Sequence, residues 1–338
     1  MDKFSFTQCV AVLFSGKPDL DEVTQSLERW PFGGWAKEAE GQDGWALSGA
    51  GWVFDLPEGG FATVDVVNHP WPDDPAVAAA SPAIGSAYSG GAFGPAATPG
   101  ALARAGDQPW LWPEGATVAS QHEAFVRIRF GFAIPKADSA EAAKPPPKRD
   151  PLYELGLLTE IAQPLLRKTG ALAFFDPAGE ALRSKEQIDA ALKRKVGSGP
   201  PPLELWTNVR SIALLRDSDA TWLGLDVVGL WQLGLPDVEA IFAEGKEDPE
   251  SVERLLRNVA VHLAAGRPVA AGSTSDDGSG RRWEASHSFA VVAPRRPVVR
   301  WLPSGSPRPS EATLQKLAQI SAGPGPTGPQ TGSGPGTG

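Results

Sequence analysis

Three apolar segments in the second half of the chain decide its fold class. They are LWTNVRSIALLRD (residues 205–217), TWLGLDVVGLWQL (221–233) and PDVEAIFA (236–243). Each is rich in the branched and aromatic residues that favour strands, and the intervening Asp-Ser-Asp and Gly-Leu-Pro favour turns. The sequence therefore predicts an antiparallel meander of three strands.

Helices are predicted before and after this meander. DPESVERLLRNVAVHLAAG (248–266) has leucine and valine residues at helical spacing, begins at Asp248 or Pro249 and ends at Gly266. DPLYELGLLTEIAQPLLRKT (150–169) has the same spacing, with Asp150 as its cap. Because such helices must bury their apolar faces, we expect an α+β fold with largely antiparallel sheets covered by three or four helices.

The first half of the chain shows the same mixture of patterns. The expected elements are a strand (6–15), a helix (17–30) and a hairpin (45–57 and 61–70). QHEAFVRIRFGFAI (121–134) alternates apolar residues with Arg127 and Arg129, which predicts a half-exposed strand with both arginines on its solvent face. Residues 81–109 are mostly Ala, Gly, Ser and Pro, so a loose excursion or a partial helix is expected there.

Composition divides the chain into two pattern-rich halves with Pro-, Gly- and Ala-rich insertions. The predicted parts are an N-terminal α+β half (1–134), a Pro/Ala-rich tether or loop (135–149), a C-terminal α+β half (150–303) and a Pro/Gly-rich, mostly disordered tail (304–338). The tether either joins two domains or forms a long loop within one.

Charge and cysteine content exclude several classes of function. The formal net charge of −9 argues against nucleic-acid binding and makes a basic protein the easier partner. The single cysteine, Cys9, excludes a disulfide framework and Cys-rich metal sites, and its apolar neighbours predict a core position. No segment is typical of a signal peptide or a membrane span, so a cytoplasmic protein without cofactor or membrane contact is expected.

A set of short motifs in the second half resembles one bacterial family. Gly234, Asp237 and Glu239 precede Asn258-Val259-Ala260 in the long helix, and Gly272 and Thr274 follow in a turn. This order is similar to that in the uncharacterised family called domain of unknown function 4261, most clearly over residues 150–302. A family position that is often aromatic is His262 here. The resemblance implies an α+β fold and no catalytic residue.

Asp237 and Glu239 are the strongest candidates for chemistry in the sequence. Side chains two apart on a strand share a face, so these carboxylates are able to share a metal or a proton. A solvated outer face is the commoner reason for such a pair, and we expect both to point into water, with Asp226 a hydrogen-bonded core acid. The alternative is a hydrolase or metal-dependent enzyme in which folding brings His287 to Asp237 and Glu239.

A binding surface is the preferred interpretation because no catalytic or metal motif is present. Trp71 and Trp112 each precede a proline, so their rings form either a contact platform or, as is commoner, lids on the edge of the core. Arg281 and Arg282 begin a basic C-terminal region of an acidic chain. The sequence thus favours a non-catalytic, immunity-type or adaptor protein of the bacterial cytoplasm, of unknown partner and oligomeric state, with no metal or cofactor.

Overall fold

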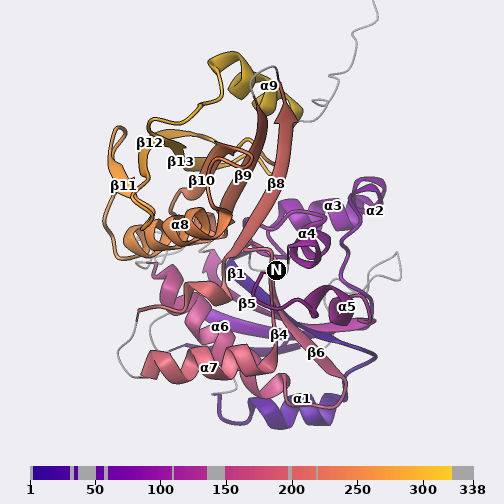
Figure 1. Ribbon diagram of the computed structural model, residues 1–338. Coiled ribbons are helices and arrows are strands. Elements are labelled where there is room, and N and C mark those ends of the chain that lie inside the picture. Colours follow the sequence, from indigo (N-terminus) through magenta and orange to yellow (C-terminus); the bar gives the residue numbers. More distant parts are fainter. Residues whose placement is uncertain are drawn as a thin grey trace, which may run out of the picture.

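The computed structural model describes residues 3–30, 34–36, 51–56, 60–108, 110–134, 149–196, 200–217 and 220–321. These residues form two mainly antiparallel sheets with helices packed against both (Figure 1). The predicted α+β class is confirmed. Among the described residues, no helix combines the length and the apolar composition that crossing a bilayer requires.

The first sheet has the strand order β2-β3-β4-β5-β1-β6-β7, and all its neighbouring strands are antiparallel. Strand β1 lies between β5 and β6, and separate apolar cores cover its two faces. The strands are β1 (Lys3–Phe14), β2 (Gly34–Ala36), β3 (Gly51–Asp55), β4 (Phe61–Val67), β5 (Ala124–Ile134), β6 (Ala171–Asp176) and β7 (Ala181–Arg183).

The second sheet has the order β11-β12-β13-β10-β9-β8. Its strands are β8 (Asn208–Arg216), β9 (Thr221–Val228), β10 (Asp237–Ala243), β11 (Thr274–Asp276), β12 (Arg282–Phe289) and β13 (Pro297–Pro303). The predicted meander is confirmed, because β8, β9 and β10 pair antiparallel in sequence order. Strand β13 joins β10 in parallel, which places the last strand of the described residues in the middle of the sheet.

Several of the helices begin at a side-chain cap. The helices are α1 (Leu20–Leu27), α2 (Pro75–Ala80), α3 (Pro82–Ser89), α4 (Ala101–Asp107), α5 (Gly115–Ala119), α6 (Pro151–Leu165), α7 (Lys185–Val196), α8 (Pro249–Ala264) and α9 (Glu311–Ser321), with the 3₁₀ turns η1 (Leu203–Leu205) and η2 (Leu230–Leu233). Side-chain caps occur at the start of α1, α2, α3, α6 and α8. Asp150 and Asp248 cap α6 and α8 as predicted, each accepting backbone N–H donors of the first turn.

One apolar core runs through both sheets. It joins Val10 and Val12 of β1 and Leu158 of α6 to Val238 of β10 and Leu256 of α8. A second core on the opposite face of the first sheet lies under α4 and α5, and a third lies between the second sheet and α9. Cys9 is buried, as its neighbours predict. The continuous core makes the two sheets parts of one packed structure.

The predicted division of the chain at 135–149 does not separate the sheets. Residues 135–148 lie outside the described part of the chain, but β6 and β7, which follow them, complete the first sheet beside β1. The chain therefore enters the second sheet only at β8. The reason is the apolar surface of β6, whose Phe174 and Phe175 are fully buried against helices on the two faces of the first sheet.

Tertiary partners overturn one local prediction and refine two others. Arg127 and Arg129 of β5 are buried rather than solvated, since both pair with Asp65 of β4 and Arg127 lies over the ring of Phe93. Within residues 81–108, the helices α3 and α4 confirm the partial-helix alternative, and the complete burial of Phe93 excludes a loose excursion. Within the predicted tail, α9 is a helix whose Leu317 packs on the second sheet, while 322–338 lie outside the described residues.

Candidate functional site

Asp237 and Glu239 lie inside the molecule, which corrects the prediction that they point into water. Their exposed fractions are 0 % and 2 %. Strand β10 lies between β9 and β13, and the sheet is covered by α8 on one face and by the segment around Val291 and α9 on the other. Successive side chains of β10 therefore alternate between two buried faces, rather than between a solvent-exposed face and a buried face.

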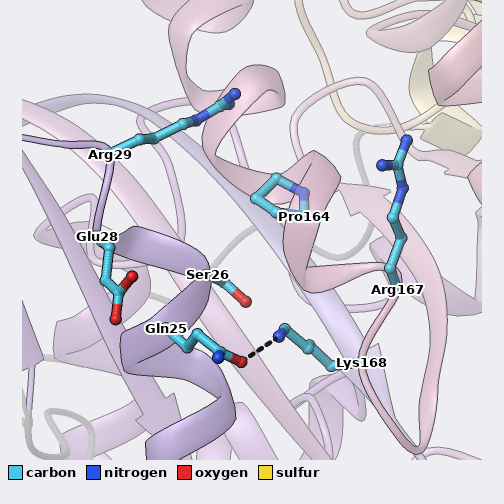
Figure 2. Close-up of a pocket in the computed structure, with 7 residues that line it drawn as sticks. All are labelled: Gln25, Ser26, Glu28, Arg29, Pro164, Arg167 and Lys168. Atoms are coloured by element: carbon cyan, nitrogen blue, oxygen red, sulfur yellow. Dashed lines mark hydrogen bonds between the residues drawn. The ribbon is translucent and has the colours of Figure 1, made fainter.

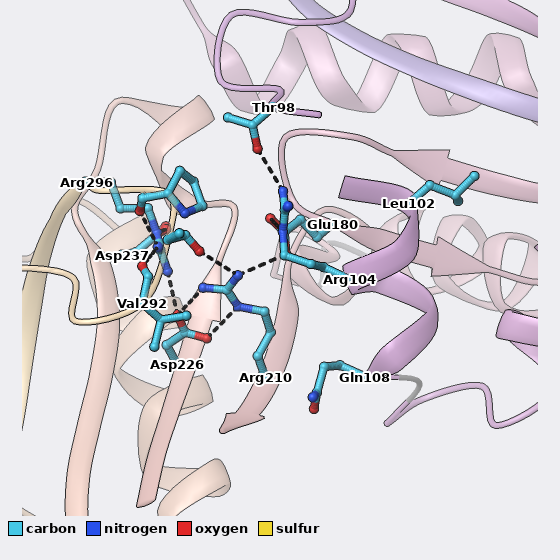
Figure 3. Close-up of polar contacts among 12 residues, drawn as sticks. Thr98, Leu102, Arg104, Gln108, Glu180, Arg210, Asp226, Asp237, Val292 and Arg296 are labelled. Atoms are coloured by element: carbon cyan, nitrogen blue, oxygen red, sulfur yellow. Dashed lines mark hydrogen bonds and ion pairs between the residues drawn. The ribbon is translucent and has the colours of Figure 1, made fainter. Parts of the chain in front are cut away.

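A chain of buried ion pairs explains how these acids tolerate burial (Figure 3). Arg296 pairs with Asp237, and its other nitrogen lies 2.6 Å from Asp226. Arg210 lies 2.5 Å from Asp226 and 3.1 Å from Glu180, which is 2.7 Å from Arg104. Three arginines thus face three carboxylates, so the charges of this network balance. Its members come from α4, the β6–β7 turn and the second sheet, so the network connects the two sheets.

The carboxylate oxygens that a metal ion or a proton transfer would require already accept hydrogen bonds from arginines and backbone N–H groups. Glu239 accepts from Arg300 Nε at 2.6 Å and from the Val291 N–H at 3.1 Å. Burial raises the pKa of Asp237 and of Glu239, against the opposing effect of Arg296 and Arg300. Burial also acts to raise the pKa of Asp226, but Arg210 and Arg296 outweigh it and hold that pKa below its usual value. Asp226 is the predicted hydrogen-bonded core acid.

The structure does not bring His287 to these acids. Residues that are opposite each other on neighbouring strands point to the same face of a sheet. His287 of β12 is opposite Val299 of β13, and Val299 is opposite Val238 of β10, so these three side chains share one face. Glu239 is opposite Arg300 and points to the other face. His287 therefore lies on the opposite side of the sheet from these acids, where its Nε2 is 2.7 Å from the Val269 carbonyl oxygen. Across the described ranges no group of three or more His, Cys, Asp or Glu side chains is arranged to hold a metal.

The four residues predicted as a binding surface do not form one. Trp71 is buried, with its ring packed among Phe93, Phe125 and Phe175, which corrects its assignment to the surface. Trp112 is half-buried against the same core. Arg281 and Arg282 lie at the start of β12 in the other sheet, where Arg281 pairs with Glu247 and Arg282 is exposed.

A basic hollow lies between α1 and the end of α6 (Figure 2). It has a volume of about 580 Å³ and contains Arg29, Arg167 and Lys168. Each cation already has a protein acceptor: Arg29 donates to the Glu160 carbonyl at 2.6 Å, Arg167 to Asp189 at 2.8 Å and Lys168 to Gln25 at 3.3 Å. Cations near the C-terminal turn of a helix stabilise its free carbonyls, so this hollow has a structural explanation.

A second concavity, which we call the α8–β11 groove, has a different lining. It has a volume of about 290 Å³ and is formed by Asn258, Val259, His262, Pro268, Val269, Ser273, Thr274, Ser275 and Trp301. The lining supplies hydroxyl, amide, imidazole and apolar groups but no Asp, Glu, Lys or Arg. Such a surface suits an uncharged ligand that both donates and accepts hydrogen bonds, and it suits neither a phosphate nor a metal ion.

Trp301, which lines the groove, carries an unsatisfied donor. It is opposite Ala240 and Ala285, which belong to the core under α8, so its ring lies on the α8 face of the sheet. Its Nε1 is buried and has no hydrogen-bond partner within the described part of the chain. A buried donor without an acceptor costs about 1–3 kcal/mol, which a suitable acceptor would recover.

The comparisons with known proteins point to the same region. Residues 226–302 match the model of a family described as Domain of unknown function (DUF4261), so this segment resembles that family. No curated protein and no solved structure matches the chain. The matched segment contains the whole groove, and three residues from the motifs of the resemblance, Asn258, Val259 and Thr274, line it together.

Sequence reasoning missed the groove although it selected part of its lining. His262 stood out because it replaces a family position that is often aromatic, and it lies one helical turn after Asn258. Ser273, Ser275 and Trp301 carried no signal, because their contribution depends on the packing of β11 and β13 beside α8.

Proposed function

We propose that this protein is a non-catalytic protein-binding module and that the α8–β11 groove is its contact surface. The observation that carries the proposal is the groove itself: an uncharged, hydrogen-bonding hollow that includes residues from two separate motifs of the matched segment, Asn258-Val259 and Thr274. The acids considered for catalysis are neutralised in the interior, so they supply no competing site.

The exposed side of α8 next to the groove fits a contact surface. Val261 is 43 % exposed and lies three residues from Asn258, so an apolar side chain borders the polar lining. The net charge of −9 favours approach of a basic partner by long-range attraction, while the uncharged groove makes the close contact. An immunity-type or adaptor role in a bacterial cytoplasm is the form of this function that we propose.

Site-specific photo-crosslinking in cells of the native host tests the proposal. Benzoylphenylalanine is placed at His262 in the groove and, as the matched control, at exposed Glu114 beside α5. We expect a discrete crosslinked product from position 262 only. Excess purified protein should compete for it, whereas the variant Asn258→Arg, which puts a long charged side chain into the groove, should not.

Two outcomes contradict the proposal. One is an absence of products at position 262, and the other is a product that forms equally at position 114 or is competed equally by Asn258→Arg.

A further inference from the structure

Strand β11 presents one edge to which no other strand is paired. It is the outermost strand of the second sheet among the described residues, and it pairs only with β12. The Asp277 N–H donates to the Arg281 carbonyl, and the Ser273 carbonyl accepts from the Ala285 N–H. Because backbone direction alternates along a strand, Ser275 also faces β12, while the N–H and C=O groups of Thr274 and Asp276 face outward.

The α8–β11 groove lies beside this strand. Ser275 is opposite Trp283, a core residue under α8, so its side chain points to the helix side of the sheet. The second wall is the face of α8 that presents Asn258 and His262. The structure thus combines a free strand edge with an uncharged hollow that is able to receive side chains from a strand added there.

We infer that the groove binds an extended peptide segment of the partner, which adds as a further strand to the outer edge of β11. This inference rests on the proposed function and names the chemistry of the partner. A peptide main chain has alternating donors and acceptors and no net charge, which matches both the outward groups of Thr274 and the uncharged lining. Alternate side chains of the added strand enter the groove against Val259 and Val269.

The unsatisfied Trp301 donor supports the same occupant. A peptide segment that fills the hollow brings carbonyl or side-chain oxygens to a lining that contains a buried, unpartnered indole N–H. Peptides that bind by this mode are therefore expected to lose affinity when Trp301 is changed to Phe, which keeps an aromatic ring and removes the donor.

A pair of substitutions at one residue separates main-chain pairing from side-chain contact. A random peptide library displayed on phage is selected against the full chain, and the enriched peptides are synthesised and titrated by calorimetry. Thr274→Pro removes the outward N–H, whereas Thr274→Val keeps it and removes the hydroxyl. We expect Thr274→Pro to weaken binding by about tenfold and Thr274→Val to bind like the unaltered protein. Thermal unfolding of both variants checks that each is folded.

A second measurement does not depend on any protein variant. Methylation of single amide nitrogens in the selected peptide should reduce affinity at every second position, since only alternate amides of an added strand face β11. Equal tolerance of methylation along the peptide, equal affinity of Thr274→Pro and Thr274→Val, or failure to select any peptide would overturn the inference. Crosslinking from position 262 would still stand in those cases, so the proposed function and this inference fail separately.

Discussion

Changing Asp226 to Asn should cause a large loss of stability with almost no change in shape. Asp226 accepts from Arg210 at 2.9 and 2.5 Å and from Arg296 at 2.6 Å, and it is buried. The substitution leaves the buried Arg210 and Arg296 and the partly exposed Arg104 with two carboxylates. Removing one partner of a buried ion pair costs about 3–5 kcal/mol, a large fraction of the free energy of unfolding of an ordinary domain.

Urea unfolding followed by far-ultraviolet circular dichroism measures this loss. Asp189→Asn is the matched control, because Asp189 pairs with Arg167 where the two side chains are 35 % and 56 % exposed. Exposed pairs contribute about 0–1 kcal/mol. If Asp226→Asn loses no more free energy of unfolding than Asp189→Asn, the network does not hold the two sheets together, and our interpretation of the buried acids is refuted.

The effect of Asp226→Asn should also depend on pH. Because the folded pKa of Asp226 lies below its usual value, its ionisation stabilises the fold above the unfolded pKa of about 3.9. That contribution is lost as the pH falls through the folded pKa. The difference in unfolding free energy between the original protein and Asp226→Asn should therefore be full at neutral pH and should shrink below about pH 4.

Three further predictions concern other positions. Burial raises the pKa of Asp176 to about 7, so between the unfolded pKa of about 4 and this value the unfolded chain is ionised at Asp176 while the folded protein keeps the proton, and the fold loses stability as the pH rises. The melting temperature should therefore fall more steeply between about pH 4 and 7 in the original protein than in Asp176→Asn, and equal slopes would contradict this. A Cβ on Gly179 would lie 2.0 Å from the Trp206 carbonyl oxygen, so Gly179→Ala should lose about 3 kcal/mol in urea unfolding, whereas Gly16→Ala, with open space around it, should stay within about 0.5 kcal/mol. At the start of α7, the Ser184 side chain accepts from the Gln187 N–H, and the Gln187 side chain accepts from the Ser184 N–H. Ser184→Ala should therefore lower the free energy of unfolding by about 1 kcal/mol in the same assay. An unchanged urea midpoint would show that this capping box does not stabilise the protein.

Local signals in the sequence predicted the elements well because their causes are local. The Asp248 cap and the leucine spacing define α8 within one helix, and the capping box at Ser184 and Gln187 depends on residues three positions apart. The meander of β8, β9 and β10 followed from apolar runs joined by short turns. These features need no knowledge of what packs against them.

The candidate site was predicted only in part, because the burial and the charge pairing of its residues depend on residues distant in the sequence. The alternation of side chains placed Asp237 and Glu239 on one face of a strand, but it does not show whether other elements pack on that face. The arginines that neutralise these acids, Arg296 and Arg300, are about sixty positions away in the chain. No local pattern in the sequence connects these two arginines to β10.

The amino-acid sequence by itself determined the α+β class, the starts of α6, α7 and α8 and the meander of β8, β9 and β10, since hydrophobic periodicity and capping act over one or two turns of chain. Tertiary structure alone decided that β6 and β7 complete the first sheet, that the acids of β10 are internal, and that Asn258, Thr274 and Trp301 share one groove. The physical reason is that burial and ion pairing are properties of a packed interior, in which the partner of a charge is chosen by proximity in space rather than in sequence.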